Sequence, residues 1–312
     1  MTSAPVRLPL PLRALAPAKI NLGLFVGPTR ADSRHELASV MQSISLADEL
    51  VLEAAPADAE HDEVLCPGVE GENLAARALA LFRQESGWTH APLRLRIEKR
   101  IPVAAGLGGG SADAAAALRL AHAASGLGDM DLMHVLARKL GADVPAQVVP
   151  GRWLASGAGE HLEVLADPFS PLGVLVLPHA GGLSTAAVYG ELDRIAPARP
   201  AFDLSERREM LARAFELGST LPVDTLLLHN DLQAAAVSLC PEIVAALEQA
   251  REAGAEAALV SGSGPTVVGL FARANGLARA ERAVAGLASR EPPALAAESV
   301  DAGFARVQPL GT

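Results

Sequence analysis

A glycine-rich run in the middle of the first half carries the clearest chemical signal in this sequence. Four of the five residues from Gly106 to Gly110 are glycines, and Ser111 and an alanine-rich stretch follow them. Glycine lets backbone N–H groups turn toward one point, and the positive end of a following helix faces the same point. Unpaired N–H donors at a helix start bind anions, and a serine hydroxyl reaches a phosphate oxygen or its metal ion. The pattern therefore predicts a phosphate-binding loop.

Two common nucleotide loops do not fit this run. A P-loop requires Lys directly after its last glycine, and a dinucleotide fingerprint spaces its glycines as G-x-G-x-x-G behind a strand. Here Gly108 is followed at once by two more glycines and Ser111. On this motif alone, a plain glycine turn before a core helix is the alternative.

Phosphoryl transfer also needs a base and a cation near the phosphates, and Asp143 and Lys19 are the candidates. Lys19 lies in the apolar segment Pro17–Leu22, where a charged side chain is costly unless it meets an opposite charge. Asp143 stands between apolar residues just past a predicted helix end. The alternatives are a surface charge at a strand end for Lys19 and a cap of the following turn for Asp143.

The elements that would position these residues mix α and β without an internal repeat. Residues 12–27 and 40–54 contain β-like alternation, and Leu93–Lys99 alternates apolar and charged residues as a half-buried strand does. This last strand leads into the glycine loop. Helices are predicted over residues 73–85, 110–125 and 131–140.

Turn residues at 166–171 precede an apolar strand over 172–177, which predicts a domain boundary near residue 166 and two domains, 1–165 and 166–312. Strands at 257–260 and 267–271 flank the turn Ser261–Thr266, and a last strand is expected near 298–307. The fold class is therefore α+β. Helices of the second half are expected over 184–193, 203–217, 229–238, 241–253 and 274–289.

Composition narrows the function classes. A chain of 312 residues, half of them hydrophobic, is long enough for two cores. Its net charge of −10 argues against nucleic acid or anionic lipid as the main partner, and 3% aromatic residues give no stacking platform for single strands. Cys66 and Cys240 have no Cys or His at ligand spacing, so neither disulfides nor a zinc site is predicted, and the compartment is reducing.

The N-terminal stretch Met1–Pro17 is interrupted by prolines and arginines and lacks the continuous apolar core of a signal peptide. No apolar run reaches the roughly 20 residues of a membrane span. We therefore expect a cytoplasmic protein without a membrane partner. No heptad repeat or apolar stripe indicates an oligomeric state.

Three motifs, taken in chain order, resemble those of the GHMP small-molecule kinases: Pro17–Leu22, Pro102–Ser111 and Ser261–Thr266. Further segments resemble the branch of this family that acts on a cytidine-diphosphate-linked methylerythritol. These segments are Arg30–His35, Leu140–Pro145, Asn230–Leu232 and Pro241–Ile243.

This resemblance implies a ribosomal-S5-like N-terminal domain, a GHMP-type C-terminal α+β domain and a site in the cleft between them. It implies transfer of a phosphoryl group from ATP, with Mg²⁺, to the 2-hydroxyl of the linked methylerythritol, a step of non-mevalonate isoprenoid precursor synthesis. The partner is then a small molecule carrying cytidine diphosphate. In-line transfer needs little covalent help, so catalysis rests on positioning and charge stabilisation.

The resemblance also assigns residues. Asp143 would accept the hydroxyl proton and Lys19 would hold it ionised, since an adjacent cation favours the carboxylate form; no residue is implied as the ligand of a resident metal. The residues implied in ATP binding are Asn73, Lys99, Pro102, Gly106, Leu107, Gly108, Gly109, Gly110 and Ser111. Those implied in substrate binding are Asn21, His35, Tyr189, Gly262, Ser263 and Gly264.

Three of these assignments have structural alternatives. Tyr189, which would stack on cytosine, could be a helix core residue, because a tyrosine often buries its ring while its hydroxyl finds a partner. His35 stands between Arg34 and Glu36 and could be an ordinary surface-loop residue. Gly262 and Gly264 could form a plain hairpin turn, although two Ser-Gly pairs between β-branched strands favour a backbone that closes over a ligand.

Two departures from the family pattern bear on the substrate. Ser33 and Arg34 precede His35 where the family usually has Gly-Tyr, and Ala158 stands where it often has Arg. A GHMP kinase for another small alcohol, such as homoserine or a mevalonate derivative, is therefore the alternative function. A non-catalytic nucleotide-binding protein of the same fold is a third hypothesis, but it would require the loss of the base or the loop.

Overall fold

The strands form two sheets in the computed structural model, which describes residues 7–222 and 225–311. The first sheet contains β1 (Leu12–Thr29), β2 (His35–Ala54), β3 (Glu63–Leu65), β4 (Leu93–Glu98), β5 (Arg152–Gly157), β6 (His161–Val164) and β11 (Gln308–Pro309). The second contains β7 (Gly173–Leu177), β8 (Ala257–Val260), β9 (Val267–Phe271) and β10 (Leu295–Glu298). Of the N-terminal stretch discussed above, residues 1–6 lie outside the described part.

The helices divide between the two sheets. Those that precede β5 are α1 (Leu74–Ser86), α2 (Gly109–Ser125), α3 (Met130–Leu140) and α4 (Val144–Val148). Those that follow β7 are α5 (Thr185–Ile195), α6 (Ala201–Phe215), α7 (Gln233–Leu239), α8 (Ile243–Glu252) and α9 (Gly276–Gly286). Two short 3-10 helices are η1 (Thr225–Leu227) and η2 (Ala302–Ala305).

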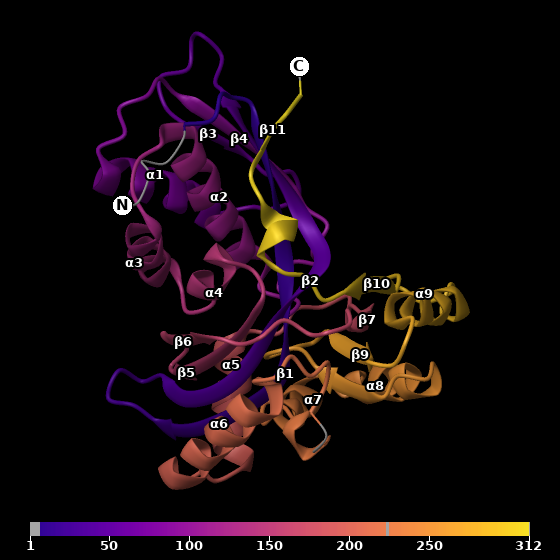
Figure 1. The fold of residues 1–312 in the computed structure, drawn as a ribbon. Helices are drawn as coiled ribbons and strands as arrows, with labels where there is room; N and C mark the ends of the chain where they lie inside the picture. The colour runs from indigo at the N-terminus through magenta and orange to yellow at the C-terminus, as the bar shows by residue number, and fades with distance from the viewer. Residues whose placement is uncertain (1–6, 223–224, 312) are drawn as a thin grey trace.

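A long hairpin of β1 and β2 runs through the middle of the molecule (Figure 1). The first sheet has the order β11-β1-β2-β4-β3, and β5 pairs with the early part of β2 while β4 pairs with its later part. The second sheet has the order β10-β7-β9-β8. β2 is long enough to pair with β5 along its first half and with β4 along its second half, so the hairpin of β1 and β2 connects the two ends of the first sheet.

Alternation along β1 places its polar residues. Ala18, Ile20 and Leu22 pack into a hydrophobic core shared with β7 and β9 of the second sheet. Successive strand residues point to opposite faces, so Lys19 and Asn21 face away from that core. The strand thus holds a buried lysine on a rigid element, on the face where the glycine loop lies.

The alanine-rich segment forms the central helix of the first core. α2 buries Ala112 and the run from Ala114 to Ala117 between α1 and the sheet. Small side chains let helix and sheet backbones approach closely, and close packing supplies most of the stability that a short helix lacks alone. The glycine loop is therefore anchored by a helix that is buried along most of its length.

The fold confirms two domains and mixed α and β structure. The boundary predicted near residue 166 falls between β6, which belongs to the first sheet, and β7, which belongs to the second. β11 nevertheless returns to pair with β1, so the end of the chain joins the first sheet.

Two sequence expectations for the second half need correction. The strand expected near 298–307 is wrong, since β10 ends at Glu298 and the chain turns into η2. Val300 N–H donates to the Ser43 carbonyl, and Asp301 caps η2 by accepting from Gly303 N–H. The helix expected from residue 229 begins at Gln233, because Asn230 forms a bridge with Leu24 instead.

Candidate active site

A cleft of about 1110 Å³ opens between the two domains. This volume exceeds the roughly 300–1,000 Å³ of a pocket for one drug-sized ligand, so it has room for two substrates. Gly264 is not among the lining residues: a Cβ added to it would point away from the cleft, toward Val260, Ala236 and Ile243 in the hydrophobic core of the second domain. The predicted residues that line the cleft are Lys19, Asn21, His35, Asn73, Lys99, Pro102, Gly106, Leu107, Gly108, Gly109, Gly110, Ser111, Asp143, Tyr189, Gly262 and Ser263.

The glycine loop has the backbone shape that its sequence requires. Gly106 and Gly108 have φ of +77° and +69°, in the left-handed region that favours glycine. Gly108 is the N-cap of α2 and no side chain caps this helix, so its first-turn N–H groups face the cleft without a side-chain acceptor. This is the arrangement that binds phosphate oxygens.

The two glycine turns pack against each other across the domain interface. Ser261 Oγ donates to the Gly106 carbonyl at 3.1 Å, and a Cβ on Gly106 would lie 2.2 Å from the Ser261 carbonyl oxygen. Gly262 lies beside Lys19: a Cβ added to Gly262 would be 3.4 Å from the Lys19 Nζ. The turn from the second domain thus forms part of the wall around the phosphate loop.

Lys19 and Asp143 meet in this cleft. The Lys19 Nζ lies 3.5 Å from a carboxylate oxygen of Asp143 and donates to Asn21 Oδ1 at 2.9 Å. Only 9% of the Lys19 side chain is exposed, against 41% for Asp143. Lys19 is therefore not a surface charge.

Asp143 is not a helix cap. It occupies the N-cap position of α4, but its side chain accepts no capping hydrogen bond. Its carboxylate is directed to Lys19 and, being partly exposed, remains accessible to a ligand in the cleft. The cap interpretation is excluded by this geometry, and a role in the cleft stays a prediction.

Comparison with known proteins fits this geometry. A family model described as GHMP kinases N terminal domain matches residues 73–151, and one described as GHMP kinases C terminal matches residues 203–290. A 4-diphosphocytidyl-2-C-methyl-D-erythritol kinase of Anaeromyxobacter dehalogenans, strain 2CP-1, is 42% identical over 268 residues, which are 83% of this chain and 80% of that protein. The chain belongs to the GHMP kinase family.

Further GHMP kinase relatives agree. A kinase of the same name from Salinispora tropica is 41% identical over 290 residues, 89% of this chain and 88% of that protein. A crystal structure of 4-(cytidine 5'-diphospho)-2C-methyl-D-erythritol kinase is 34% identical and superposes with a TM-score of 0.72 over 92% of this chain and 98% of that one. A homoserine kinase from Cytophaga hutchinsonii, at 16% identity and a TM-score of 0.71, shares the fold.

One end of this GHMP kinase cleft carries an aromatic pair. The rings of His35 and Tyr189 lie 5.0 Å apart, and His35 Nε2 lies 2.9 Å from an oxygen of Asp193. Burial, with a smaller contribution from Asp143, raises the pKa of the Tyr189 hydroxyl to about 12. Tyr189 is half-buried, packs against a hydrophobic core of the second domain and also lines the cleft, and its contact with a substrate stays a prediction.

The two departures from the family pattern lie at the same end. Arg34 lines the cleft and pairs with Asp32 through a hydrogen bond of 2.9 Å. At the position of Ala158, the Glu160 side chain accepts from the Ala158 N–H and from Arg30, both at 2.5 Å. The guanidinium of Arg30 thus lies beside the turn that contains Ala158, where the family often has an arginine.

Asn73 and Lys99 have structural partners at the other end. Asn73 caps α1 by accepting from the N–H groups of Ala75 and Ala76. Lys99 Nζ lies 2.5 Å from Asp48 and 2.7 Å from Asp113, and all three side chains are largely buried. Both residues still line the cleft, so the predicted ATP contacts stay predictions.

Sequence reasoning missed the roles of Asp48 and Asp113. Asp48 accepts from the N–H groups of Arg100 and Ile101 and so fixes the chain where it enters the glycine loop. Burial raises the pKa of the Asp113 carboxyl to about 7 despite the adjacent Lys99. The available signal was the single acid Asp113 within an alanine run, because an acid there requires a buried partner; Asp48 stands next to Glu49 and gave no such signal.

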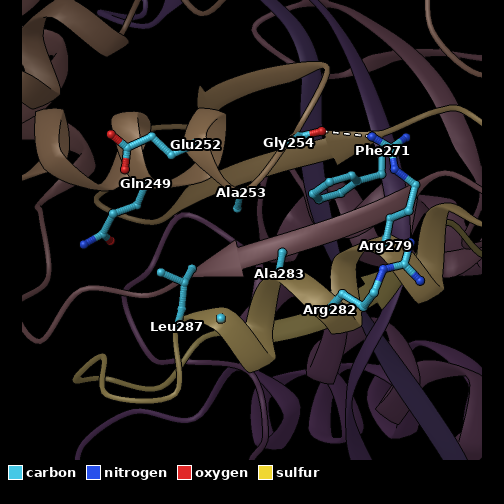
Figure 2. A pocket seen from close by; sticks show the side chains of 10 residues that line it. Gln249, Glu252, Ala253, Gly254, Phe271, Arg279, Arg282, Ala283 and Leu287 are labelled. Carbon is cyan, nitrogen blue, oxygen red and sulfur yellow. Dashed lines mark hydrogen bonds between the residues drawn. The ribbon is translucent and has the colours of Figure 1, made fainter.

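A second hollow of about 540 Å³ lies between α8 and α9 (Figure 2). Arg279 borders it and donates to the Gly254 carbonyl, while Gln249, Glu252 and Arg282 complete its polar rim. None of the residues predicted from the sequence lines it. It therefore has no part in the site assembled around Lys19 and Asp143.

Proposed function

We propose that this chain transfers the γ-phosphoryl group of ATP to the 2-hydroxyl of 4-diphosphocytidyl-2-C-methyl-D-erythritol, in cytoplasmic non-mevalonate isoprenoid precursor synthesis. The observation that carries the proposal is the Lys19–Asp143 pair, 3.5 Å apart, beside an uncapped glycine loop in one cleft. The names of relatives 40–42% identical over most of the chain support the choice of substrate.

The pair supplies the chemistry of the acceptor. Asp143 accepts the proton of the 2-hydroxyl as the oxygen attacks the γ-phosphorus, and ADP leaves on the opposite side. Lys19 keeps Asp143 ionised and stabilises charge on the reacting oxygens. Asn21 holds the ammonium in place, and its own amide donates to Ser39 Oγ at 2.7 Å, so the lysine cannot swing away.

The glycine loop holds the phosphates of ATP. N–H groups of the first turn of α2 face the cleft, and a side chain on Gly110 would meet nothing within 4 Å, which leaves room for phosphate oxygens. Ser111, half-buried in the same turn, is suited to hold Mg²⁺ through its hydroxyl. When bound with ATP, Mg²⁺ neutralises part of the phosphate charge.

Tyr189 and His35 form the end of the cleft that receives cytosine. A half-buried ring with its neighbour 5.0 Å away presents a flat apolar surface for stacking. Asp193 orients His35 through the contact at 2.9 Å. Arg34 supplies a cation where the family places an aromatic, which suits a diphosphate better than a base.

The same substitution favours the second candidate, a kinase of another small alcohol. Because Arg34 stands where the family usually has a tyrosine, Tyr189 is the one ring assigned to stacking on cytosine. Homoserine and mevalonate carry no base, so a kinase acting on them would not need the missing tyrosine.

A coupled ADP-release assay with Mg²⁺ distinguishes these functions. We expect kcat/KM for the cytidyl substrate to exceed that for homoserine or mevalonate by at least a hundredfold. A preference for either small alcohol would overturn the choice of substrate, and no turnover with any of the three would overturn the assignment as an active kinase.

The Asp143→Asn variant tests the base. We expect kcat to fall by about 10²- to 10⁴-fold, the usual contribution of a general base. The variant also removes the ion-pair partner of Lys19, whose side chain is 9% exposed, so urea unfolding has to measure the loss of stability separately from the loss of kcat. Asp131→Asn, an exposed aspartate in the first turn of α3, is the matched control and should keep wild-type kcat.

A further inference from the structure

A cluster of three potential metal ligands lies outside the cleft, in the second domain. His179, Cys240 and Glu242 each offer one ligand atom, and these atoms lie within 4.8 Å of one another. Their spacing along the chain predicted no zinc site, because His179 follows β7 while Cys240 and Glu242 lie at the junction of α7 and α8. The fold brings together what the sequence separates.

The distances match the edges of a zinc tetrahedron. With Zn–S of about 2.3 Å and Zn–N or Zn–O of about 2.0–2.2 Å, neighbouring ligand atoms lie about 3.5 Å apart. Cys240 Sγ lies 3.6 Å from His179 Nε2 and 3.4 Å from Glu242 Oε2. The Glu242 side chain is exposed, so rotation can close the remaining edge without moving the backbone.

The backbone around the cluster is firmly held. Cys240 ends α7 with its N–H donating to the Ala236 carbonyl at 2.8 Å, and its own carbonyl accepts from the Ile243 N–H at 3.2 Å. Arg290 donates to the Pro178 carbonyl at 2.6 Å and so fixes the chain next to His179. Preformed ligands of this kind lose little freedom on binding an ion.

The surroundings of His179 suit a metal ligand. Its Nδ1 lies 3.4 Å from the Gly181 carbonyl oxygen, the kind of acceptor that orients a zinc-bound imidazole. In the present geometry Nδ1 instead accepts from the Gly181 N–H at 3.0 Å, which places the proton on Nε2 beside the sulfur. Binding therefore requires the imidazole proton to move to Nδ1 and the thiol proton to leave.

We propose that His179, Cys240 and Glu242 form a Zn²⁺ site whose fourth position is taken by water. Thiolate, imidazole and carboxylate together favour zinc over the Mg²⁺ that accompanies ATP, since Mg²⁺ prefers oxygen ligands alone. Cys240 is 7% exposed while Glu242 is exposed, so the sulfur forms the floor of the site and the water side faces solvent.

The ion would join two segments that border the cleft. The chain from His179 passes Gly182, whose missing Cβ would lie 3.0 Å from the Ala104 side chain of the glycine loop, and continues to Leu183 and Thr185 in the cleft wall. Zinc would hold this segment to the α7–α8 junction. Its role is therefore to stabilise the second domain beside the site, without touching the reacting groups.

Cobalt titration of the reduced, chelator-treated full chain tests the site without ATP or substrate. We expect one Co²⁺ per chain, with a thiolate-to-cobalt charge-transfer band and the intense visible bands of tetrahedral cobalt, both bleached by one equivalent of ZnCl₂. His179→Asn and Glu242→Gln should weaken Co²⁺ binding at least tenfold, and Cys240→Ser should abolish the charge-transfer band. Cys66→Ser is the matched control for thiol binding and should keep it.

Three results would overturn the proposal. The first is the absence of a charge-transfer band in the wild-type chain. The second is a band that persists in Cys240→Ser but is lost in Cys66→Ser. The third is wild-type affinity for Co²⁺ in both His179→Asn and Glu242→Gln. The last two variants change half-buried or exposed side chains, so they report on the site even if Cys240→Ser does not fold. ZnCl₂ should also raise the Tm of the wild-type chain and leave that of Glu242→Gln unchanged.

Discussion

Replacing Gly106 with alanine tests how closely the two domains meet at the phosphate loop. The added Cβ would lie 2.2 Å from the Ser261 carbonyl oxygen and 3.0 Å from backbone atoms of Gly264. These contacts are with backbone, which cannot rotate away as a side chain does. The φ of +77° adds a second cost, because an L-residue with a side chain rarely adopts it.

The two costs have separate magnitudes. A left-handed φ costs alanine about 1–2 kcal/mol, and inserting a methyl group into a packed contact costs about 1–3 kcal/mol. We therefore expect Gly106→Ala to destabilise the chain by about 2–5 kcal/mol. Gly87→Ala isolates the first cost, because Gly87 has φ of +68° and its Cβ would meet nothing within 4 Å. Gly110→Ala has neither cost and should gain up to about 1 kcal/mol from helix propensity.

Urea unfolding measures these differences, and initial rates measure their effect on ATP. In Gly106→Ala the loop has to move away from Ser261, so its N–H groups leave the phosphates and KM for ATP should rise at least tenfold. Gly87 lies outside the cleft, and its variant should keep the wild-type KM. If Gly106→Ala loses no more stability than Gly87→Ala and binds ATP normally, the contact between the turns is not as close as described.

Three further predictions concern single side chains. Lys19→Met keeps the length of the buried side chain but removes its charge. We expect kcat to fall by about 10²- to 10³-fold, as for loss of one transition-state donor, while KM for ATP stays within threefold. An unchanged kcat would remove Lys19 from the mechanism. Tyr189→Ala should raise KM for the cytidyl substrate at least tenfold while Tyr189→Phe keeps it, and equal effects of both would exclude stacking. Burial raises the pKa of Asp113 to about 7, so between about pH 4 and pH 7 this carboxyl holds a proton in the folded chain that it releases in the unfolded chain, and its contribution to stability falls as pH rises. The Asp113→Asn variant lacks this titrating group, so urea unfolding between about pH 4 and pH 7 should find its free energy of unfolding rising relative to that of the wild type as pH rises. Parallel curves of unfolding free energy against pH for the two proteins would contradict this prediction.

Local sequence determined much of this protein. The alternation of Leu93–Glu98, the glycines that follow and the alanine-rich segment specify strand, loop and helix through contacts between near neighbours, and the structure confirms all three. The lone lysine in an apolar strand indicated an acidic partner, since the cost of burying an isolated charge does not depend on the fold.

Only the tertiary structure decided which groups meet. Lys19 and Asp143 come from β1 and the turn before α4, and their separation of 3.5 Å depends on how α2 and α4 pack on the first sheet. The Asp48–Lys99–Asp113 cluster and the convergence of His179 on Cys240 likewise arise from long-range packing. The missed end of β10 has the same cause, because the carbonyl of Ser43, far earlier in the chain, draws Val300 out of the strand. Spacing along a chain encodes local geometry, whereas the meeting of distant side chains is set by the packing of whole elements.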